Sequence, residues 1–236
     1  MKKLFTLLAL IGVAVALWVS GRDRLREAGN HLGVGNKTVG PIARFVYRND
    51  PWHSAAYPLA LEKMALTPDD AYLDIACGAG GLLSQALETV DHAAGLDHSP
   101  AGIEVAREAN AAALEAGRLE LHEGDAGDLP WEDATFDAVS NLNTIHVMED
   151  PLPLLREAHR VLKPGGRFLL VTQSPEALEG PMWGLMRSML VLHTDDELAS
   201  MLRDVGFSAV EAYSPDGDRQ VGYGIKAVVD ENEASG

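Results

Sequence analysis

The sequence is poor in cysteine and, over most of its length, in basic residues. Cys77 is the only cysteine among 236 residues, which excludes a disulfide framework and any zinc site that needs several thiolates. The formal net charge is −16, and residues 49–236 carry eleven Lys or Arg against thirty-three Asp or Glu. Because so acidic a body repels a phosphate backbone, a nucleic-acid substrate is not expected.

One long hydrophobic run spans residues 4–19. Two lysines precede it and three arginines follow it, and its length is at or just below the roughly 20 residues of a bilayer-spanning helix. The run ends in bulky residues and not in the small-x-small pattern of a signal-peptide cleavage site. We therefore expect an uncleaved membrane anchor with the body on the cytoplasmic side. A secretory signal peptide and a buried or interfacial helix are the alternatives.

Composition divides the chain into four segments. Residues 1–28 hold the hydrophobic run and its basic flank, and residues 29–70 form a glycine-rich linker followed by an N-terminal helical cap. Residues 71–229 alternate between strand and helix patterns, and residues 230–236 are an acidic tail. Since the sequence contains no internal repeat and no low-complexity block, the alternating segment is interpreted as one domain.

Short apolar strands separated by helices predict a buried parallel sheet. The expected strands are 72–76, 93–97, 119–123, 136–141, 167–172, 208–213 and 222–229. The expected helices are 44–66 (interrupted at two prolines), 81–90, 100–116, 151–162 and 195–205. The last two strands are joined by a turn alone, which predicts an antiparallel hairpin. We therefore predict a doubly wound α/β fold with a mostly parallel seven-stranded sheet, preceded by an N-terminal hydrophobic helix.

A glycine loop follows the first expected strand and opens a helix at residues 77–81. Glycines let the backbone turn tightly and approach a ligand closely, and Asp97 at the end of the next strand can accept hydrogen bonds from ribose hydroxyls. Leu83 stands where a dinucleotide-binding loop has its third glycine or alanine. Asp74 would repel a pyrophosphate and attract a cationic amino group. This pattern favours an adenosyl ligand that carries an amino acid, and a nicotinamide-dependent oxidoreductase is the alternative.

At this point the chain resembles the class I S-adenosylmethionine (SAM)-dependent methyltransferases of the small-molecule type, over roughly residues 71–229. The resemblance rests on Leu73-Asp74-Ile75-Ala76-Cys77-Gly78-Ala79-Gly80, Gly95-Leu96-Asp97-His98-Ser99, Gly124-Asp125-Ala126, Phe136-Asp137-Ala138-Val139 and Leu162-Lys163-Pro164-Gly165-Gly166. These motifs together are specific for the superfamily and leave the acceptor open.

The resemblance implies SAM as the cofactor and assigns its contacts. The glycine loop would hold the amino acid and ribose parts of SAM, and Asp97 the ribose hydroxyls. His98 would lie beside the adenine, Asp125 would accept from its amino group, and Ala126 would flank the ring. With Asn141, which ends the fourth strand, the predicted cofactor-binding residues are Asp74, Ala76, Cys77, Gly78, Gly80, Asp97, His98, Asp125, Ala126 and Asn141.

Methyl transfer from a sulfonium needs alignment above all, and a base only where the nucleophile carries a proton. His146, just after the fourth strand, is the best candidate base, and Asn143 is a candidate for orienting the acceptor. His193 is a weaker candidate. Cys77 is interpreted as a small residue selected for fit rather than as a nucleophile. The histidines show no metal-ligand spacing, so no metal site is predicted.

The acceptor is expected to be a small or lipid-like molecule. Residues 174–192 are rich in Met and Pro and could cover an acceptor pocket, although the Met spacing fits a helix packed on the core slightly better. The N-terminal cap, with Tyr47, Trp52, His53 and Tyr57, is the other candidate wall. A membrane-tethered module that binds SAM without catalysis is a further alternative.

Overall fold

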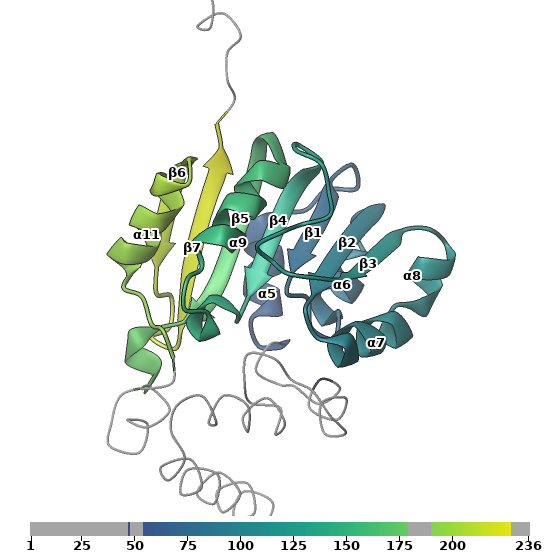
Figure 1. Cartoon of the computed structure of the whole chain (residues 1–236), viewed down its shortest axis with the longest axis horizontal. Helices are drawn as coiled ribbons and strands as arrows, with labels where there is room; N and C mark the ends of the chain where they lie inside the picture. The colour runs from purple at the N-terminus through teal and green to yellow at the C-terminus, as the bar shows by residue number, and fades with distance from the viewer. Residues whose placement is uncertain (1–46, 48–53, 179–189, 228–236) are drawn as a thin grey trace, which may run out of the picture.

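The chain alternates between strands and helices in the computed structural model, which describes Tyr47, residues 54–178 and residues 190–227 (Figure 1). The elements are α5 (Tyr57–Met64), β1 (Ala71–Ile75), α6 (Gly81–Ala86), β2 (His92–Asp97), α7 (Pro100–Ala109), α8 (Ala111–Glu115), β3 (Leu119–Glu123), β4 (Phe136–Leu142), η1 (Ile145–Val147), α9 (Leu152–Val161), β5 (Leu162–Gln173), η2 (Pro175–Leu178), α11 (Asp195–Asp204), β6 (Phe207–Tyr213) and β7 (Arg219–Lys226).

The described strands form one seven-stranded sheet in the order β3-β2-β1-β4-β5-β7-β6. β1 to β5 pair in parallel, whereas β7 is antiparallel to both β5 and β6. The predicted α/β fold, with its mostly parallel sheet and C-terminal hairpin, is therefore confirmed. The parallel strands run toward the lower edge of Figure 1, so the loops that follow β1, β2, β3, β4 and β5 meet there.

Helices cover both faces of the sheet, as a sheet buried on both faces requires. On one face α5, α6 and α7 pack through Ala60, Leu82 and Ile103, and on the other α9 and α11 pack through Leu154 and Leu198. Figure 1 shows α9 and α11 in front of the sheet and α5 behind it. Neighbouring strand residues point to opposite faces, so the central strands β1 and β4 are buried along nearly their whole length, whereas the edge strand β3 alternates between buried leucines and more exposed polar residues.

Local sequence signals account for where several helices begin. The Ser99 side chain accepts from the backbone N–H of Gly102 at the start of α7, and Pro100 occupies the first helical position. Thr194 caps α11. Its side chain accepts from the N–H of Glu197 while the Glu197 carboxylate accepts from the N–H of Thr194.

Two helix predictions were wrong in length. The helix expected over 100–116 is broken into α7 and α8 at Asn110, whose side-chain amide donates to the carbonyl oxygens of Gly80 and Ala106. The helix expected over 81–90 ends at Ala86, and turns follow it. In the first case a contact distant in sequence overrides the helix-forming preference of the alanine-rich segment.

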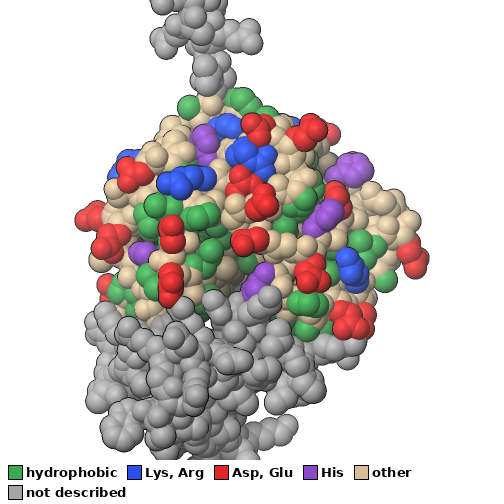
Figure 2. All heavy atoms as spheres, in the orientation of Figure 1, with side chains coloured by type: hydrophobic (Ala, Val, Ile, Leu, Met, Phe, Trp, Pro, Cys, Tyr) green, Lys and Arg blue, Asp and Glu red, His purple; other side chains and the backbone are tan. Residues whose placement is uncertain are grey.

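Several predictions concern residues outside the described part of the chain. These include the hydrophobic run 4–19, the acidic tail, Trp52, His53 and most of the Met- and Pro-rich stretch. Among the helices that the structure does describe, none combines the length and the apolar character that crossing a bilayer requires. Acidic side chains are spread over the face of the described body that Figure 2 presents.

Candidate functional site

The turn after β1 is built from left-handed backbone positions. Ala76 has φ +60°, Gly78 +53° and Gly80 +70°, and such values favour glycine over residues with a side chain. The N–H of Cys77 donates to the carbonyl of Leu96 on β2 over 3.0 Å, and the N–H of Gly80 donates to that of Cys77 over 2.9 Å. The turn therefore places the backbone of residues 76–80 at the carboxyl edge of the sheet and connects it to the start of α6.

A polar network supports this glycine loop from below. The Asn110 side chain is 6% exposed and donates to the Gly80 carbonyl over 3.3 Å. The Ser84 hydroxyl lies 2.7 Å from Asn110 Oδ1, to which it donates. A Cβ on Gly80 would lie 2.8 Å from Asn110 Nδ2, so the close approach of the two residues requires glycine there. The loop is thus fixed by contacts within the protein.

Asp97 joins the ends of β1 and β2. Its carboxylate accepts from the backbone N–H of Gly78 through Oδ2 and from that of Ser99 through Oδ1, both over 2.8 Å. The side chain is 4% exposed. Each carboxylate oxygen can accept about two hydrogen bonds, so Asp97 fixes the glycine loop and retains acceptor capacity for a pair of ribose hydroxyls.

Asp74 lies beside the glycine loop and is also buried. The Ser140 hydroxyl on β4 donates to Asp74 Oδ1 over 2.6 Å, and the Tyr72 hydroxyl lies 2.7 Å from Ser140 Oγ. Burial raises the pKa of Tyr72 well above its usual value, so the phenol is neutral. Sequence reasoning predicted Asp74 as a site residue but did not connect it with Tyr72 or Ser140, which the parallel pairing of β1 with β4 brings together.

A pocket lies above the loop, between it and two tyrosines of the N-terminal cap. Its lining includes Tyr47, Tyr57, Asp74, Gly78 and Leu142, together with Ala76, Cys77, Ala79 and Leu82. A Cβ on Gly78 would lie 3.4 Å from the Tyr47 ring, and one on Gly81 would lie 2.7 Å from the Tyr57 hydroxyl oxygen. Tyr47 and Tyr57, predicted only as candidate walls of an acceptor pocket, thus lie directly on the glycine loop.

Leu83 and Cys77 pack beneath the loop against Gly95 of β2. A Cβ on Gly95 would lie 2.6 Å from Leu83 Cδ1 and 3.0 Å from Cys77 Sγ. Burial raises the pKa of the Cys77 thiol well above its usual value, so the thiol is protonated and a poor nucleophile. This environment agrees with the interpretation of Cys77 as a residue selected for fit, and it explains why bulky Leu83 is accommodated after this glycine loop.

Asp125 lies in the loop after β3, at the same edge of the sheet. β2 and β3 pair in parallel with Asp97 opposite Glu123, so Asp125 is two residues beyond the position adjacent to Asp97. Its Oδ1 accepts from the N–H of Gly127 over 2.8 Å in a tight turn. Asp74, Asp97 and Asp125 therefore follow neighbouring strands to one edge, as the sequence predicted. Ala126 is half-buried against the cluster of apolar side chains under α9.

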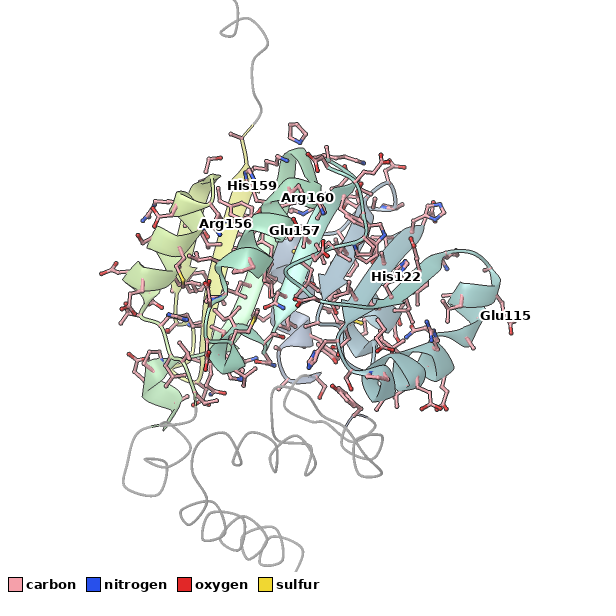
Figure 3. All side chains as sticks on the ribbon, in the orientation of Figure 1. Glu115, His122, Arg156, Glu157, His159 and Arg160 are labelled. Carbon is pink, nitrogen blue, oxygen red and sulfur yellow. The ribbon has the colours of Figure 1, made fainter. Side chains whose placement is uncertain are left out.

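The loop that carries Asp125 is held to α9 by hydrogen bonds from two side chains of the helix, Glu157 and Arg160, which also form an ion pair with each other. Glu157 Oε2 accepts from the N–H of Leu129 over 2.8 Å, and Arg160 donates to the carbonyl of Leu129 and, over 2.8 Å, to that of Trp131. Hydrogen bonding to Arg160 lowers the pKa of Glu157. Figure 3 labels both side chains on α9, on the side of the helix that faces this loop. Sequence reasoning did not identify this support.

His98 is adjacent to Asp97 at the end of β2. Its Nδ1 lies 3.5 Å from Asp97 Oδ1, and its side chain is 38% exposed. Its Nε2 is buried, and within the described residues it has no hydrogen-bond partner. Its location beside the Asp97 carboxylate fits a residue that faces an adenine, and that role remains a prediction.

The residues after β4 form a second group, which we call the acceptor side. Asn143 has φ +55°, and its N–H donates to the carbonyl of Val171 on β5 over 2.8 Å. His146, in η1, places Nδ1 3.1 Å from the hydroxyl oxygen of buried Thr172, and its carbonyl accepts from the N–H of Val191. The structure thus brings the candidate base and the candidate orienting residue to the carboxyl ends of β4 and β5.

Asn141 lies on the other face of the sheet from Asp74. Ser140 reaches Asp74, and the next residue on β4 points the opposite way. Asn141 is fully buried, its Nδ2 donates to the carbonyl of Ile75 over 2.8 Å, and its Oδ1 has no partner in the described part of the chain. Its predicted contact with the cofactor or with the methyl-transfer site remains a prediction.

Comparison with known proteins identifies the family. A family model described as "Methyltransferase domain" matches residues 73–170, which span β1 to most of β5 and hold the glycine loop, Asp97 and Asp125. The apo structure of the S-adenosylmethionine-dependent methyltransferase SibL is 25% identical, with a TM-score of 0.60, and the match covers 75% of this chain and 56% of SibL. The chain carries a class I SAM-dependent methyltransferase domain. Its cofactor is SAM.

Two curated relatives place the methyltransferase among enzymes named for different acceptor atoms. It is 28% identical over 199 residues to an O-methyltransferase of Pyrenophora dematioidea, a match that covers 77% of this chain and 74% of that protein. It is 32% identical over 157 residues to the ubiquinone/menaquinone biosynthesis C-methyltransferase UbiE of Geotalea daltonii. This match covers 63% of this chain and 65% of that protein. The methyltransferase thus spans between about half and three quarters of the lengths of these two proteins and SibL.

The pocket fits SAM by its chemistry. Asp74 in the pocket wall offers a carboxylate to a protonated amino group, and the glycines allow close approach of the backbone. Asp97 supports Gly78 from outside the pocket lining and has acceptor capacity that would suit ribose hydroxyls. In the described residues no group of three or more His, Cys, Asp or Glu side chains is arranged to hold a metal ion. The lining of the pocket offers a carboxylate, backbone groups and aromatic side chains to a cofactor.

Proposed function

We propose that the protein transfers the methyl group of SAM to an oxygen or carbon atom of a small or lipid-like acceptor. The observation that carries this proposal is the pocket between the glycine loop and the two cap tyrosines, with Asp74 in its wall and Asp97 beneath it. When bound, SAM supplies an electrophilic methyl group on a sulfonium, so the protein has to hold that methyl in line with a nucleophile.

The acceptor side supports a nucleophile that loses a proton. If Thr172 accepts the proton on His146 Nδ1, the other ring nitrogen carries the lone pair that a general base needs. Asn143 lies between β4 and His146 and can orient the acceptor through its amide. A hydroxyl or an acidic carbon is the kind of acceptor for which a histidine base is useful.

The acceptor class rests on charge and on the relatives. The acidic body disfavours polyanionic acceptors. The relatives carry the names of an O-methyltransferase and of a quinone-biosynthesis C-methyltransferase. A phenol or hydroquinone offers both an acidic hydroxyl and a nucleophilic ring carbon, so we propose molecules of this class as the first acceptors to test.

Two measurements test the proposal in sequence. Calorimetry should show that the purified full-length protein binds SAM and S-adenosylhomocysteine and leaves NAD unbound. The protein is then incubated with SAM labelled in its methyl group and with phenols, hydroquinones, phospholipid vesicles, RNA or unrelated protein. We expect label in the phenols or hydroquinones. Binding without transfer to any acceptor would favour the non-catalytic module, and transfer to RNA alone would contradict the acceptor class.

We also propose that residues 4–19 tether the protein to the cytoplasmic face of a membrane, and this proposal rests on sequence alone. The run is apolar, the flanking residues are basic, and anionic lipid attracts basic segments. Full-length protein and a variant starting at Gly21 should separate on fractionation, with the full-length chain in the membrane pellet. A full-length chain found entirely in the supernatant would contradict the tether.

A further inference from the structure

Three polar side chains form a buried hydrogen-bonded chain at the base of the pocket. Tyr72 and Asp74 are two residues apart on β1 and share a face of the sheet, and Ser140 pairs with Asp74 across the β1–β4 ladder. Tyr72 is 1%, Ser140 0% and Asp74 3% exposed. Sheet interiors are mostly apolar, and burying polar groups has a cost unless they are hydrogen-bonded. Three linked polar groups at this depth therefore invite a functional explanation.

The hydrogen bonds in this chain have one direction. A hydroxyl has a single proton, and Ser140 uses its proton toward Asp74 Oδ1, because a carboxylate only accepts. Tyr72 is therefore the donor to Ser140 Oγ. The raised pKa of Tyr72 keeps this donor protonated. Hydrogen bonds in series polarise one another in a low-dielectric interior, so the Tyr72 hydroxyl strengthens the bond that Ser140 makes to the carboxylate.

Asp74 is the end of this chain that reaches the pocket, where it shares the wall with Tyr47, Tyr57 and Gly78. The bond from Ser140 fixes the rotation of the carboxylate about its Cβ–Cγ bond. A group fixed in its bound geometry loses less conformational freedom when a ligand arrives. Neither Tyr72 nor Ser140 is among the residues that line the pocket, so each would act on the ligand through Asp74.

We propose that Tyr72 and Ser140 are positioning residues, which hold the Asp74 carboxylate against the protonated amino group of the cofactor's methionine moiety. This inference rests on the SAM site of the proposed function and specifies how one part of that site is built. It predicts that both hydroxyls matter for ligands with the amino group and do not matter for ligands without it.

Two ligands separate this role from the general integrity of the pocket. S-adenosylhomocysteine carries the amino acid moiety, whereas 5′-methylthioadenosine has the same adenosine and sulfur without it. Calorimetry with both ligands is carried out on the full-length native protein, Tyr72→Phe and Ser140→Ala. We expect each variant to bind S-adenosylhomocysteine about 5- to 10-fold more weakly, as for the loss of one hydrogen bond, and 5′-methylthioadenosine as tightly as the native protein does.

Tyr223→Phe on β7 is the matched control, because it removes a phenol hydroxyl outside the pocket lining and should leave both affinities unchanged. Equal weakening of both ligands in Tyr72→Phe and Ser140→Ala would overturn the positioning role, and so would unchanged affinity for S-adenosylhomocysteine. Two separate substitutions keep the test available if one variant does not fold. Failure of the native protein to bind either ligand would instead overturn the proposed function.

Discussion

The cofactor side and the acceptor side of the sheet edge differ in how their buried polar groups are satisfied. After β1 and β2, Asp97 accepts from two backbone N–H groups, and Asp74 accepts from Ser140. His98 Nε2 on the cofactor side is buried and has no hydrogen-bond partner among the described residues, whereas on the acceptor side and the segments packed on it three buried polar atoms lack one. They are Asn141 Oδ1, His193 Nε2 and Gln220 Oε1.

This difference has an energetic meaning. A buried polar atom without a partner costs folding about 1–3 kcal/mol, whereas a satisfied one is close to neutral or stabilising. The orientation of both amides is fixed, since Asn141 Nδ2 donates to the Ile75 carbonyl and Gln220 Nε2 to the Asp195 carboxylate. The cofactor side is thus largely pre-organised by its own contacts, and the acceptor side holds three of the four buried polar atoms that lack a partner in the described residues.

The largest effect of a single substitution is expected on the acceptor side, at His146. Replacing His146 with Ala should lower kcat by about 100-fold or more with a hydroxyl acceptor, because general bases contribute at least that much. The affinity for SAM should stay unchanged, since the ring contacts Thr172 on the acceptor side. Single-turnover kinetics and calorimetry on the same preparation measure the two quantities. An unchanged kcat would remove His146 from the mechanism.

The substitution Asp97→Ala should have the next largest effect, and it should weaken the affinity for SAM. Asp97→Ala removes the acceptor of two backbone N–H groups and, with it, the predicted acceptor of the ribose hydroxyls. We expect SAM binding to weaken by at least about 1–3 kcal/mol, or about 5- to 150-fold in Kd. Glu123→Ala, on the neighbouring position of β3 but solvent-exposed, is the matched control and should bind normally. A folded Asp97→Ala protein with native affinity would disprove the assignment.

Features that depend on residues close together in the sequence could be predicted from the sequence alone, whereas contacts between distant segments could not. The order and approximate positions of the strands and the hairpin follow from local patterns, and the structure bears them out, although β5 and β7 begin earlier than expected, at Leu162 and Arg219. The glycine loop and Asp97 are also predictable, because a turn and the next strand end lie within about twenty residues of each other. Tyr72 and Ser140, by contrast, come together only because β1 pairs with β4, and no local pattern reveals that pairing.

The misjudged helix at residues 100–116 has the same cause. An alanine-rich segment favours one continuous helix, yet Asn110 ends α7, where its side chain contacts Gly80 and Ser84. The two tyrosines that cover the pocket could likewise be predicted only as candidate wall residues. Tyr47 and Tyr57 precede the domain in sequence, and their aromatic character alone does not show that they cover Gly78 and Gly81.

Packing beneath the cofactor side can be tested through Gly95. A Cβ at this position would lie 2.6 Å from Leu83 Cδ1, 2.9 Å from Leu121 Cδ2 and 3.0 Å from Cys77 Sγ. Gly95→Ala should therefore destabilise the fold by about 1–3 kcal/mol, the usual cost of overpacking a core, as measured by urea unfolding. Combining it with Leu83→Val, which removes a methylene from the closest neighbour, should recover part of the loss. Native stability of Gly95→Ala would show that the core is looser than described.

The smallest expected effect concerns His193 on the acceptor side. Burial lowers the pKa of His193, which Glu197 only partly opposes, so the folded protein resists protonating a ring that the unfolded chain protonates near pH 6.5. The stability that this neutral histidine contributes is present above about pH 6.5 and is lost as the pH falls through that value and then through the lower folded pKa. Between pH 7.5 and 5.5 the Tm of the native protein should therefore fall by a few degrees more than that of His193→Gln. His92→Gln, which changes an exposed histidine at the start of β2, should retain the native pH dependence. If His193→Gln loses as much Tm as the native protein, the unpaired ring nitrogen is not the source of the acid sensitivity of the acceptor side.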